Sequence, residues 1–327
     1  MRPKIFVSQP IGPTALARLQ KIADVEMIPD ASTIISKERM IDGTRGCDIL
    51  LPLLHDIVDR DVMAANPKLR AITSMSITPD RIDVAEATAR KIPVTVVPAM
   101  AVETTADLTF ALMLATARRV VEGDLLMRSG RFPGAQSNYL AGGFVYGKTL
   151  GLVGGRGRIG RAVARRARGF SMRILYQSRQ RMDPEQEREL GAIYVSLDEL
   201  LRESDIISLH PNMTPETHHM IGARELGLMK PTAYLINTSR GPVIDEKALA
   251  EALIARRIAG AGLDVFEYEP IVEPGLLNLS NVVLTPHLGS AVLEVRDQMA
   301  NVVVDNIEAL LAGQKPPNCV NPQVLGA

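Results

Sequence analysis

Three polar residues in the C-terminal half of the chain have the types needed to hold an anionic substrate and move a proton. Arg240 lies in Asn-Thr-Ser-Arg-Gly (237–241), Glu269 in Phe-Glu-Tyr-Glu-Pro (266–270) and His287 in Thr-Pro-His-Leu-Gly (285–289). Each follows an apolar, strand-like run, and α/β proteins place reacting groups at the carboxyl ends of strands. A guanidinium binds a carboxylate through two parallel hydrogen bonds, and an imidazole exchanges protons near neutral pH. A carboxylate beside the imidazole favours its charged form. The three residues therefore predict proton transfer on a carboxylate-bearing substrate.

A second chemical signal is the glycine-rich segment 155–160, which reads Gly-Arg-Gly-Arg-Ile-Gly. The pattern alone is weak, but here it follows an apolar run at 149–153 and opens a helical pattern at 161–167, which is the context that a dinucleotide site requires. The glycines let the backbone approach a pyrophosphate, and a helix N-terminus offers unpaired N–H groups. The alternative is a purely structural glycine turn.

The residues after the next expected strand bear on the choice of dinucleotide. An NAD site usually has an acidic residue there for the ribose 2′-hydroxyl, whereas Ser178, Arg179 and Gln180 occupy this segment. A serine hydroxyl and a guanidinium can both bind a 2′-phosphate. We therefore expect NADP(H) to be preferred, with NAD(H) possible. In the alternative interpretation Arg179 is a solvated charge and NAD binds without its usual acidic partner.

The elements that must position these residues alternate between strands and helices, which predicts an α/β fold with parallel sheets. Near the N-terminus, apolar runs predict strands at 4–7, 48–51, 71–73 and 93–97, with a helical pattern at 14–22 and a long helix from near Val102. A second series of strands is expected at 149–153, 173–176, 205–209, 233–237, 260–264 and 282–285. A final long helix is expected to be capped by Ser290 and to end at Gly313.

Length and composition limit the classes of protein and partner. The 327 residues suggest roughly two domains, and 46% hydrophobic residues suffice for a core in each. The formal net charge of zero predicts no nucleic-acid or anionic-membrane partner. The only two cysteines, Cys47 and Cys319, have no metal-ligand spacing, so we expect neither a metal site nor a disulfide framework. The N-terminus does not resemble a signal peptide, and a cytoplasmic protein is expected.

Taken in order, the motifs resemble those of the D-isomer-specific 2-hydroxyacid dehydrogenase family, and the Ser-Arg pair at 178–179 is most similar to its glyoxylate/hydroxypyruvate reductase branch. The blocks that carry the resemblance span nearly the whole chain and lie at 106–107, 155–160, 210–217, 237–241, 262–270 and 286–291. The resemblance implies two Rossmann-like, doubly wound parallel-sheet domains with the cleft between them. Residues 1–101 plus 290–327 would form a discontinuous substrate domain, and residues 102–289 the NAD(P)-binding domain. It also implies a homodimer, with the long helix near Val102 and the following loop in the interface.

The same resemblance implies reduction of a small 2-keto acid to a D-2-hydroxy acid. Arg240 would hold the substrate, His287 would donate the proton and Glu269 would orient the imidazole, while hydride comes from the nicotinamide. The residues expected to bind the cofactor are Thr105, Gly155, Gly157, Arg158, Ile159, Gly160, Ser178, Arg179, Gln180, His210, Pro211, Thr217, Thr238, Ser239, Arg240, Asp264, His287 and Gly289. The residues expected to bind the substrate are Ser76, Ile77, Thr78, Arg240 and His287.

Two segments depart from the family pattern. Gly154 is one residue more than the family usually has before the last glycine of the loop, which predicts a slightly longer turn. In the loop whose N–H groups would bind the substrate carboxylate, Thr78 replaces a glycine and Pro79 has no N–H. The substrate preference is therefore open. A non-catalytic dinucleotide sensor on the same fold is the alternative function, and turnover of keto acids would discriminate the two.

Overall fold

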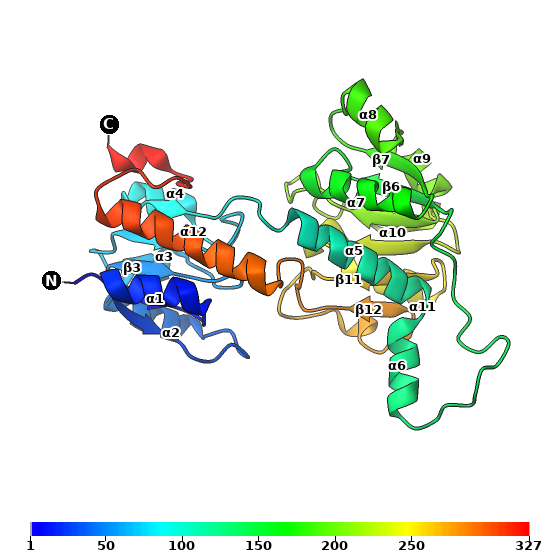
Figure 1. The fold of residues 1–327 in the computed structure, drawn as a ribbon, viewed down its shortest axis with the longest axis horizontal. Helices are drawn as coiled ribbons and strands as arrows, with labels where there is room; N and C mark the ends of the chain where they lie inside the picture. The colour runs from blue at the N-terminus through cyan, green and yellow to red at the C-terminus, as the bar shows by residue number, and fades with distance from the viewer. Residues whose placement is uncertain (1, 327) are drawn as a thin grey trace. The chain divides into compact units, whose positions relative to one another are not determined.

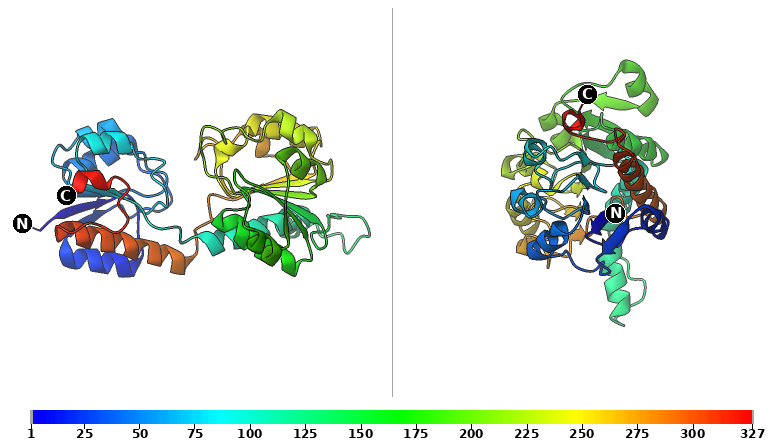
Figure 2. Two further views of the ribbon diagram at one scale, coloured as in Figure 1. Left: turned by 90° about the horizontal axis from the view of Figure 1, so that it is seen from above. Right: turned by 90° about the vertical axis from the view of Figure 1, so that its left-hand side faces the viewer.

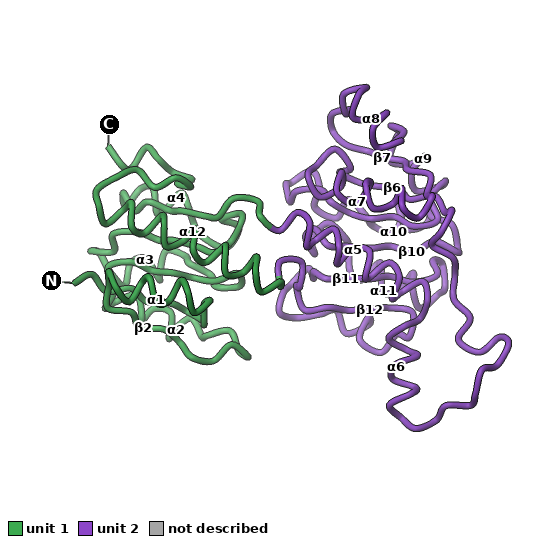
Figure 3. Tube along the Cα trace, viewed as in Figure 1, with its two compact units in different colours: residues 1–100, 291–327 green, residues 101–290 purple. Residues whose placement is uncertain are grey.

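The computed structural model describes residues 2–326 and divides into two compact units, each with its own parallel sheet. One unit contains residues 1–100 and 291–327, and the other contains residues 101–290 (Figure 3). The chain therefore leaves the first unit, forms the second and returns to the first at its C-terminal end. Within the described residues, no helix combines the length and the apolar character needed to cross a membrane.

The sheet of the first unit has the strand order β2-β1-β3-β4-β5, with all neighbours parallel. Its strands are β1 (Lys4–Val7), β2 (Asp24–Met27), β3 (Ile49–Leu51), β4 (Ala71–Thr73) and β5 (Val94–Thr95). The order reverses next to β1, so the helices that connect successive strands cover both faces of the sheet.

Helices cover the two faces of this sheet in separate groups (Figure 2). The helices of the unit are α1 (Pro13–Ile22), α2 (Lys37–Arg45), α3 (Arg60–Ala64), α4 (Val84–Ala89) and α12 (Leu293–Leu311). Successive strand residues alternate between the faces. Ile5 and Val7 therefore lie in the core with α1 and α12, whereas Phe6 lies in the core with α2, α3 and α4. The C-terminal α12 thus completes the hydrophobic core that the N-terminal strands begin.

The sheet of the second unit is larger and has the order β12-β11-β10-β9-β6-β7-β8, again with parallel neighbours. Its strands are β6 (Thr149–Val153), β7 (Arg173–Gln177), β8 (Ala192–Tyr194), β9 (Ile206–Leu209), β10 (Tyr234–Asn237), β11 (Gly260–Leu263) and β12 (Val282–Leu284). The order reverses between β6 and β9. Ligands of open α/β sheets bind at such a reversal, beyond the carboxyl ends of the strands.

Helices again cover both faces of this sheet (Figures 1 and 2). On one face α5 (Val102–Ala117) and α7 (Arg158–Gly169) pack against each other and the strands. The other helices are α6 (Val120–Arg128), α8 (Pro184–Leu190), α9 (Leu197–Glu203), α10 (Ala223–Leu228) and α11 (Glu246–Ile254). Of these, α9, α10 and α11 cover the opposite face. α6 protrudes from the unit with the loop that follows it (Figure 1) and contains no buried residue.

The structure adds two edge strands to the sequence interpretation and corrects the cap of the last helix, whereas the glycine expected at its end is confirmed. The edge strands β2 and β8 were not predicted, because β2 alternates acidic and apolar residues and β8 has only three residues. Ser290 is not the N-cap of the last helix, which begins at Leu293 after Val292. The helix ends at Leu311, and Gly313 follows in the left-handed conformation that glycine favours there.

Candidate active site

The three residues singled out for proton chemistry follow three neighbouring strands of the second unit. Arg240 comes three residues after β10, Glu269 lies in the loop after β11, and His287 comes three residues after β12. β10, β11 and β12 are adjacent and parallel. Their carboxyl ends therefore meet at one edge of the sheet, which brings the three loops together.

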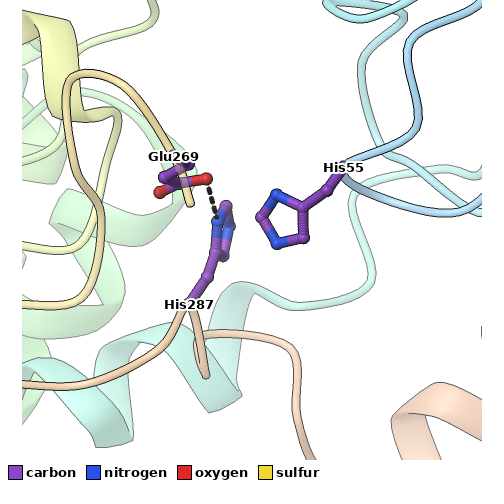
Figure 4. A group of neighbouring side chains, drawn as sticks. All are labelled: His55, Glu269 and His287. Atoms are coloured by element: carbon purple, nitrogen blue, oxygen red, sulfur yellow. Dashed lines mark hydrogen bonds and ion pairs between the residues drawn. The ribbon is translucent and has the colours of Figure 1, made fainter. Parts of the chain in front are cut away.

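His287 and Glu269 form a hydrogen-bonded pair (Figure 4). The Nδ1 atom of His287 lies 3.1 Å from Oε2 of Glu269, and the other carboxylate oxygen of Glu269 accepts a 3.0 Å bond from the Phe266 amide. The side chains are 26% and 11% exposed, so the pair is reachable but largely removed from water. Nδ1 is therefore the imidazole nitrogen that faces the carboxylate. His55, also drawn in Figure 4, follows β3 in the other unit.

The backbone at His287 is held in an unusual conformation by Asp264. The φ angle of His287 is 55°, a left-handed value that costs a residue with a side chain roughly 1–2 kcal/mol. The His287 amide donates to the Asp264 carbonyl at 2.9 Å. The Asp264 carboxylate accepts bonds from the Thr285 hydroxyl at 2.6 Å, the Leu288 amide at 2.7 Å and the Gly289 amide at 2.9 Å. The loop that carries the imidazole is therefore wrapped around one buried carboxylate.

Asp264 is only 1% exposed, and burial raises the pKa of its carboxyl group, against the opposing effect of the Thr285 and Leu288 hydrogen bonds. Sequence motifs implied a cofactor role for Asp264. The observed partners of its carboxylate all belong to the loop 285–289, so in this structure the carboxylate organises the position of His287.

The first turns of α5 fasten the other end of this loop. The hydroxyls of Thr104 and Thr105 donate to the carbonyl of Gly289 at 2.8 and 3.2 Å. One turn later, the hydroxyls of Thr109 and Thr238 lie 2.9 Å apart, which links α5 to the loop after β10. Thr105, Thr238 and Gly289, all expected at the cofactor, thus also hold the loops of Arg240 and His287 to the same helix.

The turn that carries Arg240 is shaped by Asn237 and Gly241. The Asn237 amide group donates to the Arg240 carbonyl at 3.0 Å, and its oxygen accepts from the Ser239 amide and hydroxyl at 3.0 and 2.8 Å. A Cβ atom on Gly241 would collide with the backbone of Phe266. The absence of a side chain at Gly241 therefore lets the Arg240 loop lie directly against the loop that leads to Glu269. The half-buried Arg240 bonds its own turn through the Ser239 carbonyl at 2.8 Å.

The glycine-rich loop joins β6 to α7. Gly154 has a φ of 78°, and its amide and that of Gly155 donate to the Gln177 carbonyl at 2.8 and 3.2 Å. A Cβ atom on Gly160 would lie 2.7 Å from the backbone of Gly155, so the loop and the helix pack too closely for a side chain. No side chain caps α7, which begins at Arg158 after Gly157, so the amides of its first turn could bind an anion. These features fit the pyrophosphate of a dinucleotide, with Arg158, Ile159 and Gly160 in the first turn.

Ser178 lies beside this loop, directly after β7. The residue is 9% exposed, and its hydroxyl accepts a 3.0 Å bond from the amide of Arg156, while Arg179 and Gln180 beside it are exposed. A hydroxyl that accepts one bond can still donate its own proton. Ser178 is therefore both a support of the glycine-rich loop and a donor available to a ligand.

The segment after β9 lies across the sheet reversal from the glycine-rich loop. His210 donates its amide to the Val153 carbonyl at 2.8 Å, and its Nε2 lies 2.9 Å from the Ser208 hydroxyl. Burial lowers the pKa of His210 to about 3, so the imidazole is neutral. Pro211 follows it, and the hydroxyl of Thr217 donates to the Asn212 carbonyl at 2.7 Å. These bonds stabilise the conformation of the segment 210–217 itself.

The residues expected to bind substrate through backbone N–H groups belong to the first unit and follow β4. The Ser76 amide donates to the Ser74 hydroxyl at 3.1 Å, the Ser76 carbonyl accepts from the Val97 amide at 3.0 Å, and the Thr78 hydroxyl donates to Asp80 at 2.7 Å. Thr78 is not among the residues with a positive φ. The loop 74–80 therefore accommodates the threonine without the left-handed conformation that only glycine adopts easily.

Sequence interpretation missed several residues that organise the site. Asn237, Thr104 and Thr285 hold the loops of Arg240 and His287, and the Arg156 amide supports Ser178. Asn237 had a local signal, because asparagine before a polar turn often bonds the backbone two residues on. The others had none, since their partners are 21 to 185 positions away.

Comparison with known proteins identifies close relatives. Residues 110–289 match the family model described as "D-isomer specific 2-hydroxyacid dehydrogenase, NAD binding domain". A protein named glyoxylate reductase from Korarchaeum cryptofilum is 49% identical over 99% of this chain and 98% of its own. The TT0316 protein from Thermus thermophilus superimposes with a TM-score of 0.89 at 41% identity, covering 97% of this chain and 99% of that one. An NADPH-dependent glyoxylate/hydroxypyruvate reductase from Sinorhizobium meliloti, solved with NADP and malonate, gives 0.82 at 33% identity, with 98% of each chain covered.

Proposed function

The chain belongs to the D-isomer-specific 2-hydroxyacid dehydrogenase family, and we propose that it reduces a small 2-keto acid to the D-2-hydroxy acid with NADPH as the preferred hydride source. The observation that carries the proposal is the hydrogen-bonded pair of His287 and Glu269, which follow β12 and β11, while Arg240 follows the next strand, β10. The pair combines a proton donor with an orienting carboxylate, and Arg240 adds a cation suited to a carboxylate substrate.

His287 is the proposed proton donor. Nδ1 is bonded to Glu269, so we assign the proton transfer to Nε2, and the loop bonds to Asp264 restrict the motion of the imidazole. A reduced nicotinamide, when bound, would supply the hydride to the keto carbon. The proton from Nε2 goes to the keto oxygen, so the carbonyl becomes a hydroxyl, and the carboxylate of Glu269 stabilises the imidazolium before transfer.

Arg240 is the proposed substrate clamp. A guanidinium binds a carboxylate and a neighbouring carbonyl oxygen with a planar fork of N–H groups that lysine lacks. Asn237 and Gly241 hold the Arg240 turn, so the fork is positioned before substrate binds. We also propose that the loop of Ser76, Ile77 and Thr78 binds the substrate carboxylate through its amides. The relatives named glyoxylate reductase make glyoxylate and hydroxypyruvate the first substrates to test.

The dinucleotide would be held at the ends of β6, β7, β9 and β10. The first-turn amides of α7, with Gly155 and Gly157 before them, suit the pyrophosphate. Ser178, Arg179 and Gln180 suit a 2′-phosphate, because the segment contains hydroxyl and guanidinium donors and no carboxylate. The Sinorhizobium relative, described as NADPH-dependent, supports this preference.

We further propose that the protein is a homodimer that uses α6 and the loop after it. Large apolar side chains are exposed over this protruding segment: Val120, Val121, Leu125, Met127, Phe132, Tyr139, Phe144 and Tyr146. Such a concentration of exposed apolar side chains is typical of a surface that is covered by a partner. A second copy of the chain is the partner proposed here.

A panel of keto acids tests the reaction. Initial rates would be measured with glyoxylate, hydroxypyruvate, pyruvate and a bulkier 2-keto acid, each with NADPH and with NADH. We expect turnover of at least one small keto acid. At low cofactor concentration the rate should be higher with NADPH than with NADH. Wherever C2 of the product is chiral, the product should have the D configuration. An absence of turnover with every keto acid and either cofactor, in protein that binds the dinucleotide, would contradict the proposal.

A further inference from the structure

We infer that Arg156, between the first two glycines of the glycine-rich loop, is a second cationic determinant of NADPH selectivity beside Arg179. The inference rests on the proposed function in one respect, namely that the 2′-phosphate of NADPH lies at Ser178. The sequence had indicated only the segment 178–180 after β7. The inference adds Arg156, which belongs to the loop before α7.

The position of Arg156 follows from one hydrogen bond. Its amide donates to the Ser178 hydroxyl at 3.0 Å, so the Cα atom of Arg156, one covalent bond from that amide, lies next to the serine. The Arg156 side chain is exposed, whereas the Ser178 hydroxyl is nearly buried. A phosphate that accepts the proton of Ser178 would therefore lie within reach of a long, flexible guanidinium anchored beside it.

The surrounding charges favour Arg156 as an anion ligand. Neither Arg156 nor Arg179 forms a salt bridge with another residue in the part of the chain that the structure describes. Arg181, by contrast, is held by both carboxylate oxygens of Glu187 at 2.7 and 2.8 Å. A guanidinium that is not already paired can give its full set of donors to a phosphate.

Arg179 has an acidic neighbour that Arg156 lacks among the described residues. The pKa of Glu216 is lowered mainly by the hydroxyl of Thr214, and the charge of Arg179 adds to this effect. Glu216 therefore lies close enough to Arg179 to offset part of its attraction for a phosphate. A second cation on the glycine-rich loop would compensate for that competition.

Arg156 differs in function from Arg158, which is only two residues away. Arg158 is the first residue of α7, where backbone amides would face the pyrophosphate that NADH and NADPH share. Arg156 lies before the helix and adjoins Ser178, which would face the 2′-phosphate that distinguishes the two cofactors. The three arginines 156, 158 and 181 thus provide a matched set with different expected effects.

The test is equilibrium binding to the full-length protein without substrate. Dissociation constants for NADPH, NADH, 2′,5′-ADP and 5′-AMP would be measured by fluorescence or calorimetry for the wild type and for Arg156→Leu, Arg158→Leu and Arg181→Leu. Arg156→Leu should weaken NADPH and 2′,5′-ADP about tenfold, equal to about 1.4 kcal/mol, and leave NADH and 5′-AMP within about twofold. Arg158→Leu should weaken both dinucleotides alike, and Arg181→Leu should change neither.

The salt dependence provides a second measurement. The effect of Arg156→Leu on NADPH should shrink as ionic strength rises, because salt screens a solvent-exposed cation and phosphate. Equal weakening of NADPH and NADH, or no change in either, would overturn the inference. Failure of the proposed function is distinguishable, since it would appear as absent keto-acid turnover while the response of 2′,5′-ADP to Arg156→Leu persists. Melting curves of each variant would verify that it is folded.

Discussion

Replacement of Asp264 by asparagine should lower the activity of this protein with little loss of its stability. The carboxylate accepts three hydrogen bonds from the loop 285–289, two at Oδ1 and one at Oδ2. Asparagine has one oxygen, so its NH₂ group must face at least one donor. In the better orientation the oxygen keeps Thr285 and Leu288, and the bond from the Gly289 amide is lost.

The magnitude follows from the bond that is lost. A hydrogen bond to a charged group contributes about 1.5–3 kcal/mol. If this energy holds His287 in its left-handed conformation, its loss should lower kcat/KM by about 10- to 150-fold, since about 1.4 kcal/mol corresponds to a factor of ten. Thr285→Val removes one donor to the same carboxylate, keeps the side-chain volume and should lower kcat/KM in the same direction by a smaller factor.

Stability should respond differently because burial raises the pKa of Asp264 above its unfolded value. Because the pKa is raised in the folded state, the carboxyl group makes its full contribution to stability at pH values below its unfolded pKa of about 3.9. This contribution is lost as pH rises through the folded pKa. Above the folded pKa the ionised group is a net cost, so at such a pH Asp264→Asn should melt within a few degrees of the wild type or above it. Below about pH 4 the wild type should gain stability relative to the variant.

The assay is kcat/KM at saturating NADPH, with the NADPH dissociation constant and the melting temperature measured on the same samples. A kcat/KM within twofold of wild type in both Asp264→Asn and Thr285→Val would refute the positioning role of Asp264. A rise in the NADPH dissociation constant that accounts for the whole effect would indicate instead a direct contact of Asp264 with the cofactor.

Three further predictions concern substrate, cofactor and assembly. Arg240→Ala should lower kcat/KM at least ~1000-fold, because it removes the charged group that binds and positions the substrate, while the NADPH dissociation constant stays within about twofold. An equal loss of kcat/KM and of NADPH affinity would contradict a substrate role. Arg257→Ala, on the surface after α11, is the control. Arg179→Asp should weaken the binding of NADPH much more than that of NADH, since a carboxylate repels the 2′-phosphate. An unchanged ratio of the two dissociation constants would show that Arg179 does not contact the 2′-phosphate. Leu125→Glu on α6 places a charge on the exposed apolar segment, so light scattering should show a monomer in place of the dimer. Glu122→Gln on the same helix should leave the dimer intact. A monomeric wild type would refute the proposed interface.

Much of the fold could be predicted because its signals are local. A buried parallel strand such as β9 is a short apolar run, and a helix such as α12 repeats apolar residues at a helical period. The edge strands β2 and β8 escaped prediction because edge strands are often short or carry charged residues: β8 has three residues, and β2 contains Asp24 and Glu26. The cap of α12 was not predicted because the first residue of a helix depends on the path of the chain that leads into it. Here the helix begins at Leu293, three residues after Ser290.

The sequence by itself determined which chemical groups this protein offers and in what order: a glycine-rich loop before a helix, a Ser-Arg segment without an acid, and an arginine, a glutamate and a histidine after apolar strands. Those properties depend on residue type and short spacing. Only the tertiary structure decided how the groups are held. Asp264 holds the loop of His287 because β11 and β12 are adjacent, and Arg156 adjoins Ser178 because β6 and β7 are adjacent. Strand order brings together residues more than twenty positions apart, and no local pattern encodes which strands become neighbours.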